Sequence, residues 1–229
     1  MNDPYNRQVF RDDMDFMFQN VILPRQSRYV TVDGRAVIYM WASNQMIGDF
    51  ASLMEEVKER YPIFFIGSDF MTSNVKGDDL ARVRALDGFM QYGLGTGNSF
   101  NSYSRMANGY WNASRNLRIL VRRLESETGK RYLFIPTFMA AYDETNIPGR
   151  SSAPLYPKTK EEMDYHAELI RSGMGSVYDR LGPFVVYSEL PEGSAVIESQ
   201  CLPKTIDSPG RYVGCGTRRL EVLKRFFSW

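Results

Sequence analysis

Apolar residues along the chain follow two spacings, one typical of helices and one typical of buried strands. Helical spacing predicts helices over residues 8–23, 46–60, 77–84, 112–127, 158–172 and 216–228. Short, nearly continuous apolar runs predict five strands, at residues 36–42, 62–68, 86–93, 131–140 and 183–190. Because strands and helices alternate, the pattern predicts an α/β fold with a parallel sheet and right-handed crossovers.

Local signals refine the beginning of this pattern. Pro24 is expected to end the first helix, since proline lacks the N–H that a helix interior needs. Residues 29–32 and the strand at 36–42 flank Asp33-Gly34, a dipeptide typical of tight hairpin turns. The apolar runs of the strands predict burial on both faces of the sheet.

The loops after the third and fourth strands are long and rich in polar and aromatic residues. They cover residues 93–111 and 141–157 and contain Tyr, Asn, Asp, Arg and Trp. A purely structural connection in such folds is 2–6 residues long. Because the loops after the strands build the site in βα folds, these loops predict a cleft for a hydroxyl-rich ligand.

Composition and motifs exclude several classes of protein. The 229 residues are 43% hydrophobic, which excludes a disordered chain, and 28 Lys+Arg against 27 Asp+Glu leave no electrostatic footprint for nucleic acid or an anionic membrane. No phosphate-binding motif follows any strand, and the glycines at 93–97 lack the required lysine and spacing. The aromatic content of 14% fits either a large core or a stacking surface for flat ligands.

Cysteine, histidine and targeting signals give further expectations. We expect Cys201 and Cys215 to be free thiols, although a bridge between them would close a short loop. The single His166 excludes a multi-histidine zinc site, and we expect no metal and no cofactor. The polar start of the chain does not resemble a signal peptide, and no apolar run is long enough to span a membrane. We therefore expect a cytoplasmic location.

Two carboxylates, Glu189 and Glu192, follow the last strand in the segment YSELPEG at 187–193. In an extended chain they would point to opposite faces, but Pro191 and Gly193 favour a turn that brings them into one pocket. Glycosidic bond cleavage needs such a pair: one group protonates the leaving oxygen, and the other acts as base or nucleophile. The alternative is a solvated loop with two surface acids, and the spacing by itself favours that alternative.

Four segments follow one another along the chain: VDGRAVIYMWA (32–42), LDGFMQYGLGTGNSF (86–100), IPTFMAAYDETNIPGR (135–150) and VVYSELPEGSAVIE (185–198). Together they resemble glycoside hydrolase family 99, the endo-α-mannosidase family, and its relatives in bacterial polysaccharide clusters. Their order and spacing match the C-terminal two thirds of the family domain. The resemblance implies a (β/α)8 TIM barrel with its site on the C-terminal rim, and metal-free, retaining hydrolysis of α-mannosidic linkages in a polysaccharide or glycan.

The resemblance also implies roles for individual residues. Glu189 would deprotonate the sugar 2-hydroxyl, which attacks C1 to give a 1,2-anhydro sugar, and Glu192 would be the general acid/base. Tyr142 matches the motif tyrosine near the reacting sugar, and Tyr92 and Asn98 fall in the matching rim loop. The chain departs from the family pattern in having Ser188, Leu190 and Pro191 around the two acids.

Other residues of the loops have two interpretations each. Asp143 and Glu144 either orient substrate or form a loop ion pair with Arg150, which is itself a candidate substrate contact. Trp111 either stacks on a sugar or packs its helix. Trp41 ends a strand on the expected rim and is a candidate ligand contact. The alternatives to a hydrolase are a non-catalytic carbohydrate-binding or scaffold remnant of such an enzyme and, less supported, a sugar-nucleotide transferase.

Five strands, set against an eight-stranded family, predict an incomplete barrel. We expect residues 1–229 to form one partial barrel domain that lacks about three N-terminal strands. Five parallel strands leave two open sheet edges, which proteins cover or pair. The chain is therefore expected either to associate with the missing barrel part or a second copy, or to rearrange its sheet edge.

Overall fold

The computed structural model describes residues 2–68, 74–90, 103–135, 137–138, 160–175 and 186–187. For residues 103–110, 137–138, 160–163, 166 and 186–187 the description covers the backbone. The chain divides into two compact units, one formed by Met1–Met90 with Leu120–Phe134 and the other by Gln91–Ile119 with Ile135–Trp229.

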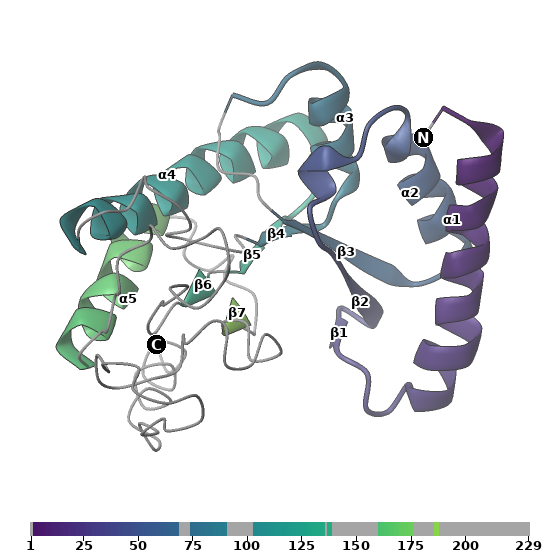
Figure 1. The fold of residues 1–229 in the computed structure, drawn as a ribbon, viewed down its shortest axis with the longest axis horizontal. Coiled ribbons are helices and arrows are strands. Elements are labelled where there is room, and N and C mark those ends of the chain that lie inside the picture. The colour runs from purple at the N-terminus through teal and green to yellow at the C-terminus, as the bar shows by residue number, and fades with distance from the viewer. Residues whose placement is uncertain are drawn as a thin grey trace, which may run out of the picture. The chain divides into compact units, whose positions relative to one another are not determined.

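Helices and short strands alternate along most of the chain (Figure 1). The helices are α1 (Pro4–Phe16), α2 (Phe50–Arg60), α3 (Gly77–Ala85), α4 (Tyr103–Thr128) and α5 (Lys160–Met174). The strands are β1 (Thr31–Val32), β2 (Arg35–Met40), β3 (Ile63–Ser68), β4 (Gly88–Met90), β5 (Leu133–Ile135), β6 (Thr137–Phe138) and β7 (Val186–Tyr187). No helix within the described ranges is both long enough and apolar enough to cross a membrane.

The strands form a curled five-stranded sheet and a separate pair. The sheet order is β1-β2-β3-β4-β5, and β6 pairs with β7. Strand β2 is parallel to β3, with Ala36 opposite Ile63, and β3 is parallel to β4, with Ile66 opposite Gly88. All five expected strands are present, the fourth split into β5 and β6. The five-stranded sheet curls into a half-barrel, and the strands of the described residues do not form one closed eight-stranded sheet.

The hairpin between β1 and β2 confirms the turn read from Asp33-Gly34. Both residues have positive φ, 50° and 74°, as a type I′ turn requires. The turn pairs Val32 with Arg35 in an antiparallel register. This hairpin sets where β2 begins, and therefore which of its side chains face the core.

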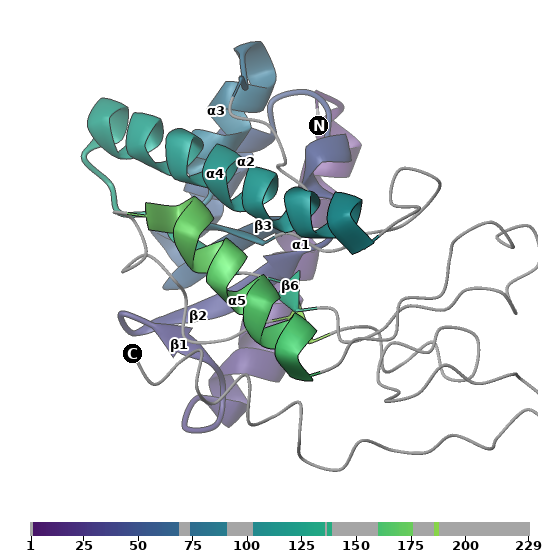
Figure 2. The same ribbon diagram turned by 90° about the vertical axis from the view of Figure 1, so that its left-hand side faces the viewer.

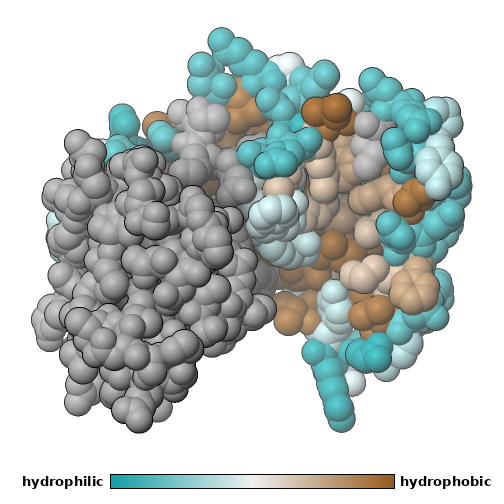
Figure 3. All heavy atoms as spheres, in the orientation of Figure 1, coloured by the Kyte–Doolittle hydropathy of each residue, from teal (hydrophilic) through white to brown (hydrophobic). Residues whose placement is uncertain are grey.

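Burial along the sheet corrects one expectation. Every residue of β3 is buried, as its apolar run predicts. Along β2, by contrast, buried Ala36, Ile38 and Met40 alternate with more accessible residues, and Tyr39 is 39% exposed. The expectation that β2 is covered on both faces is therefore wrong, because β2 lies next to the two-residue strand β1 near the sheet edge, where one face is less covered. Figure 3 shows apolar residues gathered over the strands and polar residues on the outer helices.

The first helix starts and ends differently from the expected range 8–23. It begins at Pro4 because Asp3 caps it, accepting the N–H of Tyr5, and proline suits the first helical turn. Beyond Phe16 the chain continues as a π-helical turn and then a 3-10 turn at Leu23–Arg25. Pro24 does not stop it, because its missing N–H falls at the start of that last turn.

The second helix, unlike the first, starts later than expected, at Phe50 and not at residue 46. Asp49 caps it and accepts the N–H of Ser52, and a 3-10 turn at Ser43–Gln45 occupies the preceding residues. Helices α3 and α5 lie within two residues of the expected ranges. The helix expected at 216–228 lies outside the described residues.

Helix α4 begins at Tyr103, so residues 103–111 are helical and were wrongly expected to be loop. Their Asn, Ser and Gly residues have low helix propensity, which is why the sequence pattern predicts a loop there. Helices α4 and α5 lie side by side (Figure 2), and Gly173 of α5 sits against the backbone of α4. A Cβ on Gly173 would lie 2.5 Å from Ser114 Cβ and 2.9 Å from the Trp111 carbonyl oxygen.

Replacing Gly173 with alanine should destabilise the protein by about 2 kcal/mol, because the added methyl group forces the two helices apart. Helix propensity alone predicts the opposite, a gain of about 1 kcal/mol. Urea unfolding measures the difference, with exposed Ser172→Ala as the control on the same helix. A Gly173→Ala variant as stable as the control would contradict the close helix contact.

Candidate functional site

The expected site lies where the parallel strands end, and the structure describes part of it. Of the expected site residues, Trp41 and Trp111 lie within the described ranges. Seven others lie outside them: Glu189, Glu192, Tyr142, Asp143, Tyr92, Asn98 and Arg150. Cys201 and Cys215 lie outside them as well, so the expected state of the thiols stays a prediction.

The strands of the pair β6–β7 come shortly before the two motifs that carry the candidate chemistry, Tyr142-Asp143 and Glu189–Glu192. The pair is parallel, with Thr137 opposite Val186 and Phe138 opposite Tyr187. Parallel strands end at the same edge of their sheet, which is where ligand sites of βα folds form. In the sequence, Tyr142 and Asp143 follow β6, and Glu189 comes soon after Tyr187 at the end of β7.

Trp41 directly follows β2 and is 61% exposed. The chain turns sharply after it, because Ala42 adopts the left-handed conformation with φ 51°. Tyr39 and Trp41 are two residues apart, so they belong to the same side of the strand, opposite to Ile38 and Met40. Trp41 thus lies at the carboxyl end of a parallel strand, as the sequence predicts.

Two buried serines connect the ends of β2 and β3 just behind Trp41. The Ser68 hydroxyl accepts the N–H of Ala42, and the Ser43 hydroxyl donates to the Ser68 carbonyl oxygen over 3.2 Å. Neither serine is exposed to solvent. These two bonds, hereafter the serine clasp, give hydrogen-bond partners to the Ala42 N–H and the Ser68 carbonyl oxygen, both of which belong to buried residues. The clasp fixes the turn that carries the chain away from the rim.

Trp111 lies in the interior of α4, and does not precede that helix. Its ring is partly buried, and the Arg115 guanidinium one turn further on lies 5.6 Å from the ring centroid. Its carbonyl oxygen faces the close contact with Gly173. These contacts fit the helix-packing interpretation of Trp111, and its contact with a ligand stays a prediction.

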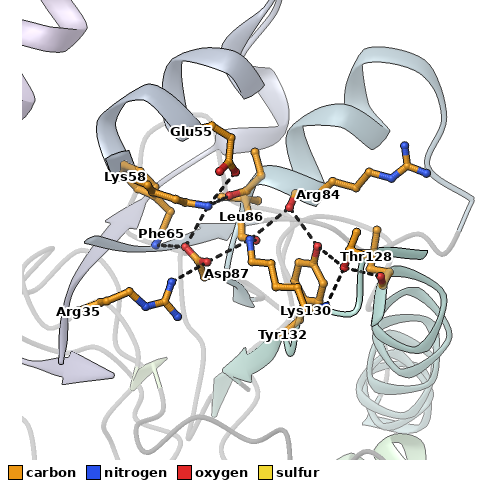
Figure 4. Close-up of polar contacts among 12 residues, drawn as sticks. Arg35, Glu55, Lys58, Phe65, Arg84, Leu86, Asp87, Thr128, Lys130 and Tyr132 are labelled. Carbon is orange, nitrogen blue, oxygen red and sulfur yellow. Dashed lines mark hydrogen bonds and ion pairs between the residues drawn. The ribbon is translucent and has the colours of Figure 1, made fainter. Parts of the chain in front are cut away.

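A group of charged residues lies at the opposite rim, where the parallel strands begin (Figure 4). Asp87, immediately before β4, is 1% exposed in its side chain and lies between three cations. Its carboxylate is 3.0 Å from Arg35 Nη1, 3.4 Å from Lys58 Nζ and 3.1 Å from Lys130 Nζ. It also accepts the Phe65 N–H over 2.9 Å. We call these four charged side chains the Asp87 cluster.

The cations of the Asp87 cluster also bind the end of α3. Lys58 donates to the Ala85 carbonyl, and Lys130 donates to the Leu86 carbonyl over 2.6 Å. The Tyr132 hydroxyl donates to the Arg84 carbonyl over 3.0 Å. Positive charge at a helix C-terminus complements the helix dipole and satisfies its unpaired carbonyls. The cluster therefore joins α2, α3, β4 and the segment before β5.

Burial and neighbouring charge act in opposite directions on the cluster. Burial by itself raises the pKa of Asp87, but Lys58 and Lys130, with the Phe65 N–H, outweigh it and hold the pKa below its usual value. Burial also lowers the pKa of Lys130, in spite of the nearby Asp87 carboxylate. In barrels the amino-terminal rim serves stability and the carboxyl-terminal rim serves catalysis. We therefore interpret the Asp87 cluster as structural.

Sequence reasoning did not single out the Asp87 cluster. The available signal was a lone aspartate before an apolar strand, but its partners come from positions far apart in the sequence. Within the described ranges, no three His, Cys, Asp or Glu side chains gather as metal ligands would.

The elements define the class of fold: parallel strands alternating with helices in a half-barrel, with a candidate site at the carboxyl ends of the strands. Three solved structures that share this fold are a glycoside hydrolase-like protein and two structures of a glycoside hydrolase. A glycoside hydrolase-like protein superposes with a TM-score of 0.67 at 17% identity, over 99% of this chain and 62% of its own.

Two structures of an endo-α-mannosidase of glycoside hydrolase family 99, from Bacteroides thetaiotaomicron, share the fold as well. The complex with bis-tris-propane has a TM-score of 0.57 at 14% identity, and covers 96% of this chain and 65% of its own. The second structure has a TM-score of 0.56 at 15% identity, with coverages of 96% and 62%. At the level of fold, these similarities confirm the resemblance expected from the four sequence segments.

The chain spans less than two thirds of the length of these solved structures. No family model matches it, and a search of curated proteins finds no match.

Proposed function

We propose that this protein is a glycoside hydrolase that cleaves α-mannoside-type linkages in a polysaccharide or glycan with retention of configuration. The observation that carries the proposal is the parallel pair β6–β7, since the Tyr142-Asp143 and Glu189–Glu192 motifs follow its two strands. The fold shared with an endo-α-mannosidase over 96% of the chain supports the same function.

In the proposed reaction Glu189 and Glu192 have separate roles. Glu189 takes the proton of the sugar 2-hydroxyl, and the resulting oxygen attacks C1 and forms a 1,2-anhydro sugar. Glu192 donates a proton to the glycosidic oxygen as its bond to C1 breaks. Glu192 then takes a proton from water, which opens the three-membered ring at C1, and Glu189 returns its proton to O2. Two inversions at C1 give net retention.

The remaining expected residues have binding roles in this proposal. Tyr142 and Asp143 lie beside the reacting sugar, and Arg150, Tyr92 and Asn98 contact its hydroxyl groups. Trp41 and Trp111 supply flat faces on which sugar rings stack. The exposure of Trp41 at the end of β2 supports its role.

Carbohydrate binding without hydrolysis is the second candidate function. One observation favours it: Ser188, Leu190 and Pro191 replace the family residues around the acids. Proline fixes φ near −65° and therefore changes where Glu192 can point. In this case a polypeptide that completes the barrel, or a second copy, would supply the missing wall of the cleft.

Incubation with a panel of α-mannans and bacterial polysaccharides separates the two candidates. The proposal predicts new reducing ends whose first-formed anomer, observed by proton NMR, keeps the configuration of the substrate. Binding without hydrolysis predicts heat in titration calorimetry and no product after long incubation. A protein that neither binds nor cleaves any glycan of the panel would overturn both.

A further inference from the structure

Arg82 on α3 is a buried arginine that reaches across to the loop after β2. It is 3% exposed, and it also pairs with Asp79 one turn earlier on its own helix. Its guanidinium donates to the carbonyl oxygens of Met46 and, over 3.3 Å, of Asn44. Both acceptors belong to the β2–α2 loop, which we define as residues 41–49.

The guanidinium suits this position for a geometric reason. Its donors project in a fixed planar fork, so one side chain can bind two carbonyl groups at once, which a lysine ammonium does less well. A buried positive charge is costly unless it is partnered, so the arrangement is tightly specified. Arg82 thus holds the segment from Asn44 to Met46 against α3.

The other end of the β2–α2 loop is held by the serine clasp. Gly67 leaves room for it, because a Cβ there would lie 2.6 Å from Ser43 Oγ and 2.5 Å from Leu86 Cδ1. The two sets of bonds hold the short 3-10 turn at Ser43–Gln45 from both of its ends. Trp41 directly precedes this segment, which is held at two places. Ala42, in the left-handed conformation, links Trp41 to the held segment and sets the change of chain direction between them.

We propose that Arg82 is a positioning residue for Trp41: by holding the β2–α2 loop, it fixes the orientation of the indole ring at the carboxyl-terminal rim. The inference rests on the proposed function in one respect, that Trp41 contacts a glycan. Arg82 itself does not touch the substrate. An aromatic ring fixed before binding loses less conformational freedom when a sugar stacks on it.

Fluorescence tests the positioning without any substrate. The chain has three tryptophans, so a background of Trp111→Phe and Trp229→Phe leaves Trp41 as the reporter. Arg82→Lys in this background should increase the fast component of the Trp41 anisotropy decay. Arg84→Lys is the matched control, because Arg84 lies on the same helix and pairs at the surface with Glu127. An anisotropy decay in Arg82→Lys equal to that of the control would overturn the inference.

Kinetics on an α-mannan oligosaccharide test the consequence for binding. In the otherwise native chain, Arg82→Lys should raise KM roughly three- to tenfold with kcat within about twofold, since uniform binding is lost and the chemistry is not. An altered anisotropy with unchanged KM in an active enzyme would overturn the link to glycan binding. If the native protein neither binds nor cleaves the glycan, the proposed function fails, and the anisotropy still decides the role of Arg82.

A second variant covers the case in which Arg82→Lys does not fold. Ser43→Ala removes the bond from Ser43 to the Ser68 carbonyl and releases the same loop from its other end. It should increase the fast motion of Trp41 in the same way, with circular dichroism confirming the fold. A folded Ser43→Ala variant whose Trp41 is as rigid as in the native chain would contradict the inference.

Discussion

Replacing Glu192 with glutamine should reduce hydrolysis of an α-mannan about 10³-fold while the fold is preserved. Glutamine has nearly the same shape as glutamate but can neither donate a proton to the leaving oxygen nor accept one from water. Loss of one general acid/base group typically lowers a rate by about 10²–10⁴-fold. The measurement is kcat/KM from the release of reducing ends, with circular dichroism as the check of folding.

Two further variants make this result specific. Glu198→Gln removes the same charge from the same segment and should leave the rate within about twofold. Glu189→Gln should slow substrates with good and poor leaving groups alike, because its role lies at the 2-hydroxyl. Glu192→Gln should leave the rate of anhydro-sugar formation from activated aryl mannosides nearly unchanged, because their leaving groups need no protonation. Turnover of α-mannan by Glu192→Gln at the native rate would exclude the proposed roles.

The strand order was accessible from the sequence because local signals encode it. The apolar run at 62–68 matches a fully buried strand, and Asp33-Gly34 forms the expected type I′ turn. Parallel pairing of β2, β3 and β4 follows from the alternation with helices. Trp41 was expected at the rim because rim positions follow directly from where a strand ends.

Features that depend on contacts between segments far apart in the sequence could not be predicted from local signals. The start of α4 at Tyr103 is one example, since its first turns contain residues of low helix propensity. The Asp87 cluster is another, because its partners Arg35, Lys58 and Lys130 come from three different segments. In the sequence, Arg82 lies on a short helix and no local signal marks it as buried. Its burial becomes visible only in the structure, where it contacts the β2–α2 loop.

Replacing Asp87 with asparagine should lower the free energy of unfolding at pH 7 by about 3 kcal/mol. Asparagine keeps an oxygen for the Phe65 N–H, so the variant mainly removes the negative charge shared by Arg35, Lys58 and Lys130. Removing one partner of a buried ion pair leaves uncompensated charge and costs about 3–5 kcal/mol. The accessible parts of the cations can regain water, which favours the lower end of that range. Urea unfolding followed by circular dichroism measures the loss.

The pH dependence of this difference identifies its cause. The pKa of Asp87 is lower in the folded protein than in the unfolded chain, so its contribution is present above the unfolded value of about 3.9 and is lost as the pH falls through the folded value. The difference in the free energy of unfolding between the native and Asp87→Asn proteins should therefore become smaller below about pH 4.

Asp15→Asn is the control for this pH dependence, because Asp15 forms a more exposed pair with Arg60. It should cost less than about 1 kcal/mol. If the difference in unfolding free energy between the native and Asp87→Asn proteins stays constant as the pH falls, the lost stability comes from shape and hydrogen bonding. The charge of Asp87 would then not be what joins α2, α3 and β4.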